Sequence, residues 1–251
     1  MLSKPAKRTR NVFDPVSKEP FVLSRSRIEN FVQCPRCFYL DRRLGIDQPP
    51  MFPYTLNSAV DILFKKEFHM YRAKKEPHPL MKTYGIDAIP FEHKDLDIWR
   101  DPFKGIRYHD SLTNLIITGG IDDVWEKRSG ELIIVDYKST STDGDVTLNG
   151  ESRESYKRQV EMYQWLFRKN KFSVAKESYF VYANGLKTEE GFFDRLKFKT
   201  VILEYIGDDS WLDELILRIH RCLLSNEMPA PSPSCNFCNY RAAVSKVEHS
   251  L

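Results

Sequence analysis

The run LIIV at residues 132–135, followed at once by Asp136, Tyr137 and Lys138, constrains the fold more than any other part of the sequence. A short run of aliphatic, largely β-branched residues is typical of a strand that is buried on both faces. Asp136 and Lys138 stand two positions apart, so on a strand they point to the same face. We therefore expect a central buried strand that ends in a carboxylate and an ammonium group.

A second strand is predicted just before this one. Residues 115–118 (LIIT) lead into residues 119–125, and Ser129-Gly130 has the composition of a turn. Strands joined by so short a connection are expected to pair as a hairpin. That pairing would bring Asp122, on the earlier strand, close to Asp136.

Two converging carboxylates repel each other unless a cation lies between them. Hard oxygen ligands favour Mg²⁺ or Mn²⁺. Such an ion can activate a water molecule and stabilise the charge on a phosphate under attack. Asp122 and Asp136 are thus candidate metal ligands, and the Tyr137 peptide carbonyl is a further one. Lys138 could orient or deprotonate the water, or neutralise the phosphate.

The rest of the pattern alternates between helices and strands, which predicts an α/β fold. Apolar periodicity predicts helices at residues 26–44, 56–71, 152–169 and 211–224, and strands at 178–183 and 198–205. Residues 74–104 lack a clear period and are expected to form a long, partly ordered connection. Residues 1–21 are interpreted as a flexible basic arm, and residues 22–251 as a single domain.

Three motifs in order resemble the PD-(D/E)XK nuclease superfamily. They are Gly119-Gly120-Ile121-Asp122, Asp136-Tyr137-Lys138 and the pair Gln159 and Tyr163, which lie four apart on one helix face. The closest resemblance is to the RecB-like and CRISPR-associated branch with cysteine-bound clusters, over about residues 24–240. It implies a restriction-endonuclease-like central mixed sheet flanked by helices, with catalytic roles for Asp122, Asp136, Lys138, Gln159 and Tyr163.

The sequence departs from that branch at one ligand position. The branch has a histidine in the helix before the hairpin, whereas this chain has Asp61 in the corresponding segment. Asp61 could replace the histidine as an oxygen ligand to the metal. Glu67 and His69, on the same predicted helix, are the other candidates.

Four of the five cysteines form two C-x2-C pairs, Cys34 with Cys37 and Cys235 with Cys238. The odd number of cysteines and the lack of a signal peptide argue against a disulfide framework and favour metal binding. The resemblance implies a [4Fe–4S] cluster held by one N-terminal and three C-terminal cysteines. Here the last position falls near Val244, so Cys37 would supply the fourth thiolate, and Zn²⁺ is an equal alternative. Either would join the two ends of the chain. Cys222 is interpreted as a core residue.

The charge of the chain permits a nucleic-acid partner without requiring one, because the net charge is only +3. Arg153, Tyr156, Lys157 and Arg158 precede Gln159 and could contact a phosphate backbone. The resemblance implies DNA as the substrate, single-stranded or at its ends, and a helicase, CRISPR or repair protein as a partner. No apolar run approaches the roughly 20 residues of a membrane span. We therefore expect a cytoplasmic location and no membrane partner.

Simpler interpretations of the same residues remain open. Asp122 and Asp123 could be surface acids beside a turn, and Asp136 with Lys138 could be a surface ion pair. Two other functions are also possible, the first because the expected histidine is missing and the second because of the cysteine pairs. The chain could be a nucleic-acid-binding module without catalysis, or a structural metalloprotein whose cysteine site supports a protein-interaction surface.

Overall fold

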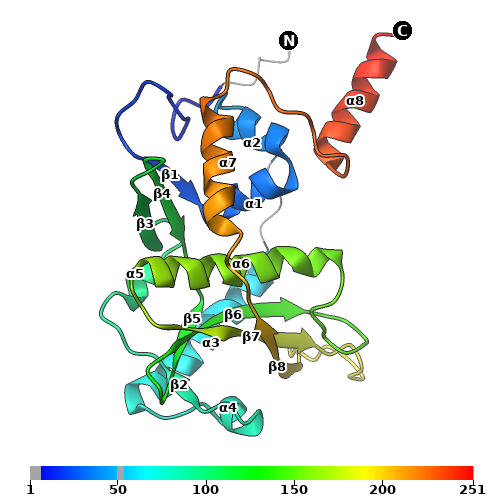
Figure 1. Cartoon of the computed structure of the whole chain (residues 1–251). Helices are drawn as coiled ribbons and strands as arrows, with labels where there is room; N and C mark the ends of the chain where they lie inside the picture. The colour runs from blue at the N-terminus through cyan, green and yellow to red at the C-terminus, as the bar shows by residue number, and fades with distance from the viewer. Residues whose placement is uncertain (1–6, 50–53, 251) are drawn as a thin grey trace. The chain divides into compact units, whose positions relative to one another are not determined.

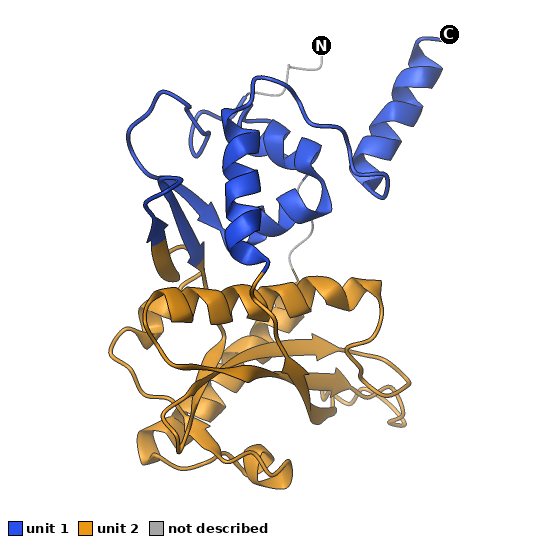
Figure 2. Ribbon diagram, in the orientation of Figure 1, with its two compact units in different colours: residues 1–51, 109–118, 211–251 blue, residues 52–108, 119–210 orange. Residues whose placement is uncertain are grey.

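The computed structural model describes residues 7–49 and 54–250, which form two compact units (Figure 2). Unit 1 comprises the described residues within 1–51, 109–118 and 211–251, and unit 2 comprises those within 52–108 and 119–210. Each unit is assembled from segments that are distant in the sequence. None of the helices in these described ranges is long and apolar enough to cross a membrane.

Unit 2 contains a five-stranded mixed sheet in the order β2-β5-β6-β7-β8. These strands are β2 (Ala88–Pro90), β5 (Asp123–Lys127), β6 (Leu132–Thr140), β7 (Val174–Gly185) and β8 (Phe198–Ile206). The pair β6 and β7 is parallel, whereas the other neighbours are antiparallel. A parallel pair requires a long crossover connection, and α6 (Glu151–Lys169) provides it.

Helices α3 (Thr55–Lys74) and α6 both pack against β6 (Figure 1). Because strand residues alternate in direction, β6 presents different side chains to its two faces. Val135 and Tyr137 join Phe64 and Phe68 of α3 in one apolar cluster. Asp136, on the other face, meets α6. The predicted hairpin is confirmed for β5 and β6, and so are the predicted strands β7 and β8. Residues 115–119, which were expected to lead into the first strand of this hairpin, form a separate strand in the other sheet.

The expectation of a long, partly ordered connection at residues 74–104 is wrong. This segment contains α4 (Pro79–Thr83), β2 and α5 (Leu96–Arg100). The elements are too short to show a period, so no sequence pattern indicated them. They are ordered by contacts instead: the His78 side chain caps α4, and Trp99 packs on Phe167.

Unit 1 contains four helices and most of a small three-stranded sheet of order β1-β4-β3. The helices are α1 (Arg25–Gln33), α2 (Pro35–Arg42), α7 (Leu212–Leu224) and α8 (Asn236–Glu248), and the strands are β1 (Phe21–Ser24), β3 (Ile106–Asp110) and β4 (Leu115–Gly119). The predicted α/β class, with mixed sheets flanked by helices, is confirmed. The second sheet was not expected, because β1 pairs with a strand far along the chain.

The single helix predicted at residues 26–44 is also wrong, because the chain forms α1 and α2 with a break at Cys34. Cys34 is extended, with φ −160° and ψ 105°. Proline disfavours the helical conformation of the residue before it, and Pro35 follows Cys34. Proline itself fits the first turn of a helix, so α2 begins there.

The predicted basic arm lies partly outside the described residues, but residues 7–21 can be described. Phe13 is buried, and Arg8 binds Asp41 of α2 with 2.6 Å between Nη2 and Oδ1. Asp41 also binds Arg27 and Arg42, at 2.9 and 2.7 Å. A buried carboxylate therefore holds together α1, α2 and the segment before β1. The interpretation of residues 8–13 as part of a free arm does not fit these contacts.

Replacing Asp41 by Asn should reduce the stability of the chain in a pH-dependent way. Burial raises the pKa of Asp41, but Arg42 and Arg27 together hold it below its usual value of 3.8. The charged carboxylate therefore stabilises the fold above that value, and the contribution is lost as the pH falls through the lowered pKa. We expect Asp41→Asn to cost about 3 kcal/mol of unfolding free energy at neutral pH. The difference from wild type should shrink as the pH falls below the usual carboxyl pKa.

Thermal unfolding of both proteins over a pH series measures this effect. The control is Asp47→Asn, because Asp47 also binds Arg8, at 3.2 Å, but is half exposed. An exposed pair contributes at most about 1 kcal/mol. The two variants could lose equal amounts of stability, or the loss for Asp41→Asn could persist at low pH. Either result would contradict the conclusion that the buried charge of Asp41 stabilises the fold.

Candidate active site

The register of β5 and β6 brings the two predicted carboxylates together. Val124 lies opposite Ile134 and Asp123 opposite Val135, where β5 begins, and continuing this register by one residue would set Asp122 opposite Asp136. Residues directly opposite in an antiparallel pair point to the same face, with Cβ atoms about 5 Å apart. The Tyr137 amide also donates to Asp122 Oδ2 at 2.9 Å, which places that carboxylate beside the end of β6.

Asp136 is fully buried and is held by two neighbours. Gln159 Nε2 donates to Asp136 Oδ1 at 2.8 Å, and Lys138 Nζ forms an ion pair with Asp136 Oδ2. Burial lowers the pKa of Lys138, but the charges of Asp136 and Asp122 outweigh it and raise that pKa above its usual value. The interpretation of Asp136 and Lys138 as an exposed surface pair is therefore excluded.

Gln159 and Tyr163 lie on the buried face of α6, where they fix the position of Asp136. Gln159 Nε2 contacts the Tyr163 hydroxyl at 3.2 Å as well as the Asp136 carboxylate. Tyr163 in turn packs closely on Gly119. A methyl group on Gly119 would lie 2.6 Å from Tyr163 Cε1, so only glycine fits there. This close approach explains why glycine stands at the start of the Gly119–Asp122 motif.

Lys65 is a site residue that the sequence did not indicate. Its Nζ lies 2.8 Å from Asp61 Oδ2 and 3.2 Å from Asp122 Oδ1, so it links α3 to the hairpin. Burial raises the pKa of Asp122, but Lys65, Lys138 and the Tyr137 amide together hold it below its usual value. Burial and the charge of Asp122 raise the pKa of Asp61. The one sequence feature that could have pointed to Lys65 is its spacing of four residues from Asp61 on a helix.

The structure brings Asp61 to this group, but not the other two candidates on α3. Glu67 binds His78, with 2.8 Å between Oε1 and Nε2. His69 is exposed. Of the residues considered for the position of the missing histidine, only Asp61 shares a partner with Asp122.

Asp123, the neighbour of Asp122, has a different environment. It is fully buried and binds Arg72, Arg100 and the Tyr137 hydroxyl, the last two at 2.8 and 2.6 Å. Because successive strand residues point to opposite faces, Asp123 faces the interior beneath α3 while Asp122 faces Asp136. The two adjacent acids thus differ in role, and neither is a simple surface residue beside a turn.

Cationic and aromatic side chains from α6 surround Lys138. Lys138 Nζ lies 4.7 Å from the centre of the Tyr156 ring, and the Arg153 guanidinium lies 5.6 Å from the same centre. Lys157 binds Glu154 with 2.7 Å between Nζ and Oε1. Tyr156 is only partly buried, so a face of polar and aromatic groups begins beside the carboxylates.

The donor set fits a hard divalent cation. Asp122 and Asp136 supply carboxylate oxygens, and the Tyr137 carbonyl lies next to Asp136 in the chain. Lys138 and Lys65 already compensate the negative charge of these acids. Cationic neighbours are what buried, converging carboxylates require.

The four paired cysteines lie together in unit 1, as predicted. Cys34 and Cys37 come from the start of α2, and Cys235 and Cys238 from the start of α8. This is the one group of three or more potential metal ligands found among the described residues. Cys222 is apart from them on α7, partly buried, where burial raises the pKa of its thiol to about 11.

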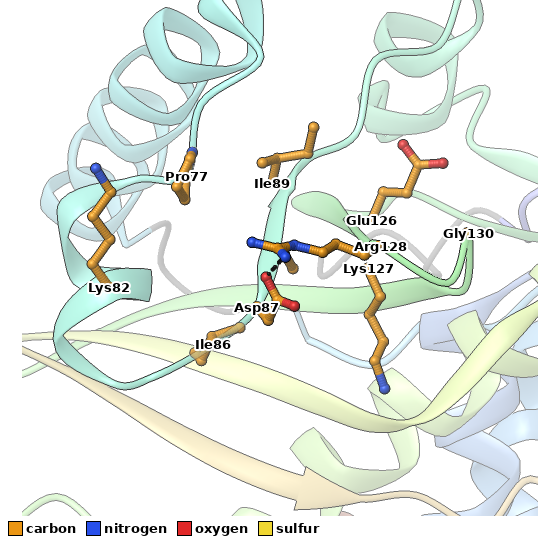
Figure 3. A pocket seen from close by; sticks show the side chains of 10 residues that line it. Pro77, Lys82, Ile86, Asp87, Ile89, Glu126, Lys127, Arg128 and Gly130 are labelled. Atoms are coloured by element: carbon orange, nitrogen blue, oxygen red, sulfur yellow. Dashed lines mark ion pairs between the residues drawn. The ribbon is translucent and has the colours of Figure 1, made fainter.

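A separate pocket of about 560 Å³ lies beside α4, β2 and the turn between β5 and β6 (Figure 3). Lys82, Asp87 and Arg128 are among the residues that line it, and Arg128 Nε binds Asp87 at 2.9 Å. None of the lining residues belongs to the Asp122–Asp136–Lys138 group. The pocket therefore contributes nothing to the candidate site.

Comparison with known proteins agrees with the geometry. The family model of the PD-(D/E)XK nuclease superfamily matches residues 61–243, which include Asp61, Asp122, Asp136, Lys138 and the Gln159–Tyr163 pair. The chain therefore belongs to the PD-(D/E)XK nuclease superfamily. That superfamily carries out metal-dependent hydrolysis of phosphodiester bonds.

Among solved structures, the one described as "Crystal structure of SSO0001" is similar over 84% of this chain and 80% of its own. Its sequence identity is 16% and its TM-score is 0.37. A search of curated proteins finds no significant match.

The two adjacent acids offer a matched test of the site. We expect Asp123→Asn to lower the unfolding free energy by about 3 kcal/mol or more, because Arg72 and Arg100 lose a buried counter-charge. Asp122→Asn should cost less, because Asp122 is partly exposed, Lys65 keeps Asp61 as a partner, and the new side-chain oxygen can still accept from the Tyr137 backbone amide. Urea unfolding followed by circular dichroism measures both. A larger loss for Asp122→Asn than for Asp123→Asn would show that the two roles are reversed.

Proposed function

We propose that the chain is a Mg²⁺- or Mn²⁺-dependent deoxyribonuclease that acts on single-stranded DNA or on DNA ends. The observation that carries this proposal is the convergence of Asp122 and Asp136 with Lys138 at the end of the central hairpin. Membership of the superfamily supports the reaction type, and the face beside Lys138 supports the substrate.

In this proposal Asp122, Asp136 and the Tyr137 carbonyl hold the metal ion, and Asp61 is a candidate further ligand. The ion, when bound, would supply positive charge at the scissile phosphate and favour ionisation of the attacking water. Lys138 donates hydrogen bonds to the phosphate or the water. Gln159 and Tyr163 keep the Asp136 carboxylate in one orientation, and Lys65 does the same for Asp122 and Asp61.

The reaction is the hydrolysis of one ester bond. The water oxygen forms a bond to phosphorus, and the bond from phosphorus to the leaving sugar oxygen breaks with its electron pair. The proton lost by the water passes to solvent, and the leaving oxygen takes up a proton. Lys138, whose pKa the charges of Asp136 and Asp122 raise, would offer positive charge to the negative charge that develops on the phosphate.

The groups on the exposed side of α6 support single-stranded DNA or a DNA end as the substrate. The partly exposed Tyr156 ring, with Arg153 beside it, can stack on an unpaired base. Lys157 and Arg158 can meet the phosphate backbone. A protein that separates or processes DNA strands, such as a helicase or a repair or CRISPR-associated protein, is the kind of partner that would supply this substrate.

One observation favours the alternative of a nucleic-acid-binding module without catalysis. Lys65 pairs with both Asp61 and Asp122, so a lysine amine already compensates two of the acids that would bind metal. In that case the face on α6 would bind DNA, but the acids would serve only to hold α3 against the hairpin.

Cleavage assays with end-labelled DNA separate these functions. Wild-type protein should cut single-stranded DNA when Mn²⁺ or Mg²⁺ is added. Asp136→Asn and Lys138→Met should each slow cleavage by at least about 100-fold, because each removes a group that acts on the reacting phosphate. DNA affinity, measured by fluorescence anisotropy, should persist in both variants.

Asp97→Asn is the matched control, since Asp97 is an exposed acid on α5 outside the site. It should cut DNA at the wild-type rate. Wild-type protein that binds DNA but never cuts it with either metal would establish the binding module instead. Equal rates for Asp136→Asn and Asp97→Asn would remove the assignment of the catalytic residues.

A further inference from the structure

The four clustered thiols of unit 1 lie unusually close to one another. Cys34 Sγ is 3.8 Å from Cys238 Sγ, and Cys37 Sγ is 3.5 and 3.6 Å from the sulfur atoms of Cys235 and Cys238. All four sulfur atoms lie within 4.8 Å of one another. Three of these residues are buried, so the group is enclosed by protein.

The two C-x2-C pairs are built alike. Cys34 is the N-cap of α2 and Cys235 is the N-cap of α8, while Cys37 and Cys238 follow in the first turn of each helix. Helix N-termini favour negative charge, because their amide groups point outwards without partners. The Ser232 amide also donates to Cys34 Sγ, at 3.4 Å. Both pairs therefore offer thiolates in the same geometry to one central point.

The sulfur separations discriminate between the two candidate metals. A tetrahedral ion with metal–sulfur bonds of about 2.3 Å holds its thiolates about 3.8 Å apart. A [4Fe–4S] cube binds each thiolate at a different iron, so its thiolates stand farther apart, roughly 6 Å. The separations in unit 1 fit the single ion and do not fit the cube.

The distribution of the cysteines agrees with this conclusion. The resemblance implies one N-terminal and three C-terminal ligands, with the last near Val244. Val244 lies within α8 and has no ligating atom. Two C-x2-C pairs that supply four thiolates are instead typical of structural zinc sites. We propose that Cys34, Cys37, Cys235 and Cys238 bind one Zn²⁺ ion, in place of the [4Fe–4S] cluster that the resemblance implies.

The proposed ion has a structural consequence for α8. None of the residues of α8 is buried, so apolar packing does not hold this helix. The segment between α7 and α8 is held by polar contacts: Arg36 Nε donates to the Pro229 carbonyl at 2.8 Å, and the Tyr39 hydroxyl donates to the Ser225 carbonyl at 2.9 Å, besides the contact of the Ser232 amide with Cys34. Zinc would therefore attach α8 to α2 within unit 1. This inference does not depend on nuclease activity.

Metal analysis of the full chain, purified without oxygen and without added metal, tests the proposal. We expect about one zinc per chain by mass spectrometry and no absorption in the visible range. Four irons per chain with a brown colour would establish the cluster and overturn the proposal, as would one iron, or a protein free of metal.

Cysteine variants provide the matched comparison. Cys235→Ser should lose the zinc, whereas Cys222→Ser, which alters the one cysteine outside the group, should retain it. Retention of zinc by Cys235→Ser would contradict the proposed ligand set. If Cys235→Ser does not fold, Co²⁺ exchanged into wild-type protein decides the point. Its absorption bands should be those of a tetrahedral thiolate site, and octahedral bands would overturn the proposal.

The role of the ion is tested by limited trypsin digestion. Arg241 and Lys246 lie on α8 and are exposed. We expect a strong zinc chelator to speed cleavage at both positions several-fold, with no change at sites in unit 2. Unchanged cleavage in zinc-free protein would show that zinc does not hold α8.

Discussion

The antiparallel pairing of β5 with β6 is the constraint on which the candidate site depends. The pairs Asp123–Val135 and Val124–Ile134, continued by one residue, set Asp122 across from Asp136, and the Tyr137 amide bonds to the Asp122 carboxylate there. A shift of one residue would turn every side chain of one strand to the other face. It would also turn Asp122 to the face beneath α3 and Asp123 to the face on which Asp136 lies. The register of a buried hairpin thus determines which of two adjacent acids can bind a metal.

Charge compensation explains how so many acids persist in a small volume. Asp123 is neutralised by Arg72 and Arg100 on the α3 face, and Asp136 by Lys138 on the α6 face. Asp122 lies between the two systems and interacts with both Lys65 and Lys138. Buried carboxylates without such partners would be strongly destabilising. In the proposed mechanism one of these cations, Lys138, also acts on the phosphate, which links the stability of unit 2 to its proposed chemistry.

Much of unit 2 could be predicted from the sequence because its central elements have strong local signals. The apolar run before Asp136, the turn at Ser129-Gly130 and the helix with Gln159 and Tyr163 each follow from periodicity and composition. Lys65 could not be predicted, because an acid and a lysine four apart are common on exposed helices. The order in residues 74–104 depends on distant contacts such as that of Trp99 with Phe167.

In unit 1 the helix break at Cys34 could have been predicted from Pro35, which follows it. The pairing of β1 with β4 could not have been predicted, because the two strands are far apart in the sequence. The separation of the sulfur atoms, which distinguishes zinc from a cluster, is not encoded in spacing at all.

The central claim is that Asp122 and Asp136 share one divalent ion. Anomalous X-ray scattering from crystals of the chain grown with Mn²⁺ tests it most directly. The account predicts a manganese peak in contact with both carboxylates and the Tyr137 carbonyl, at distances of about 2.1 Å. Crystals soaked in saturating Mn²⁺ that show no peak there, or a peak that touches only one of the two carboxylates, would contradict it.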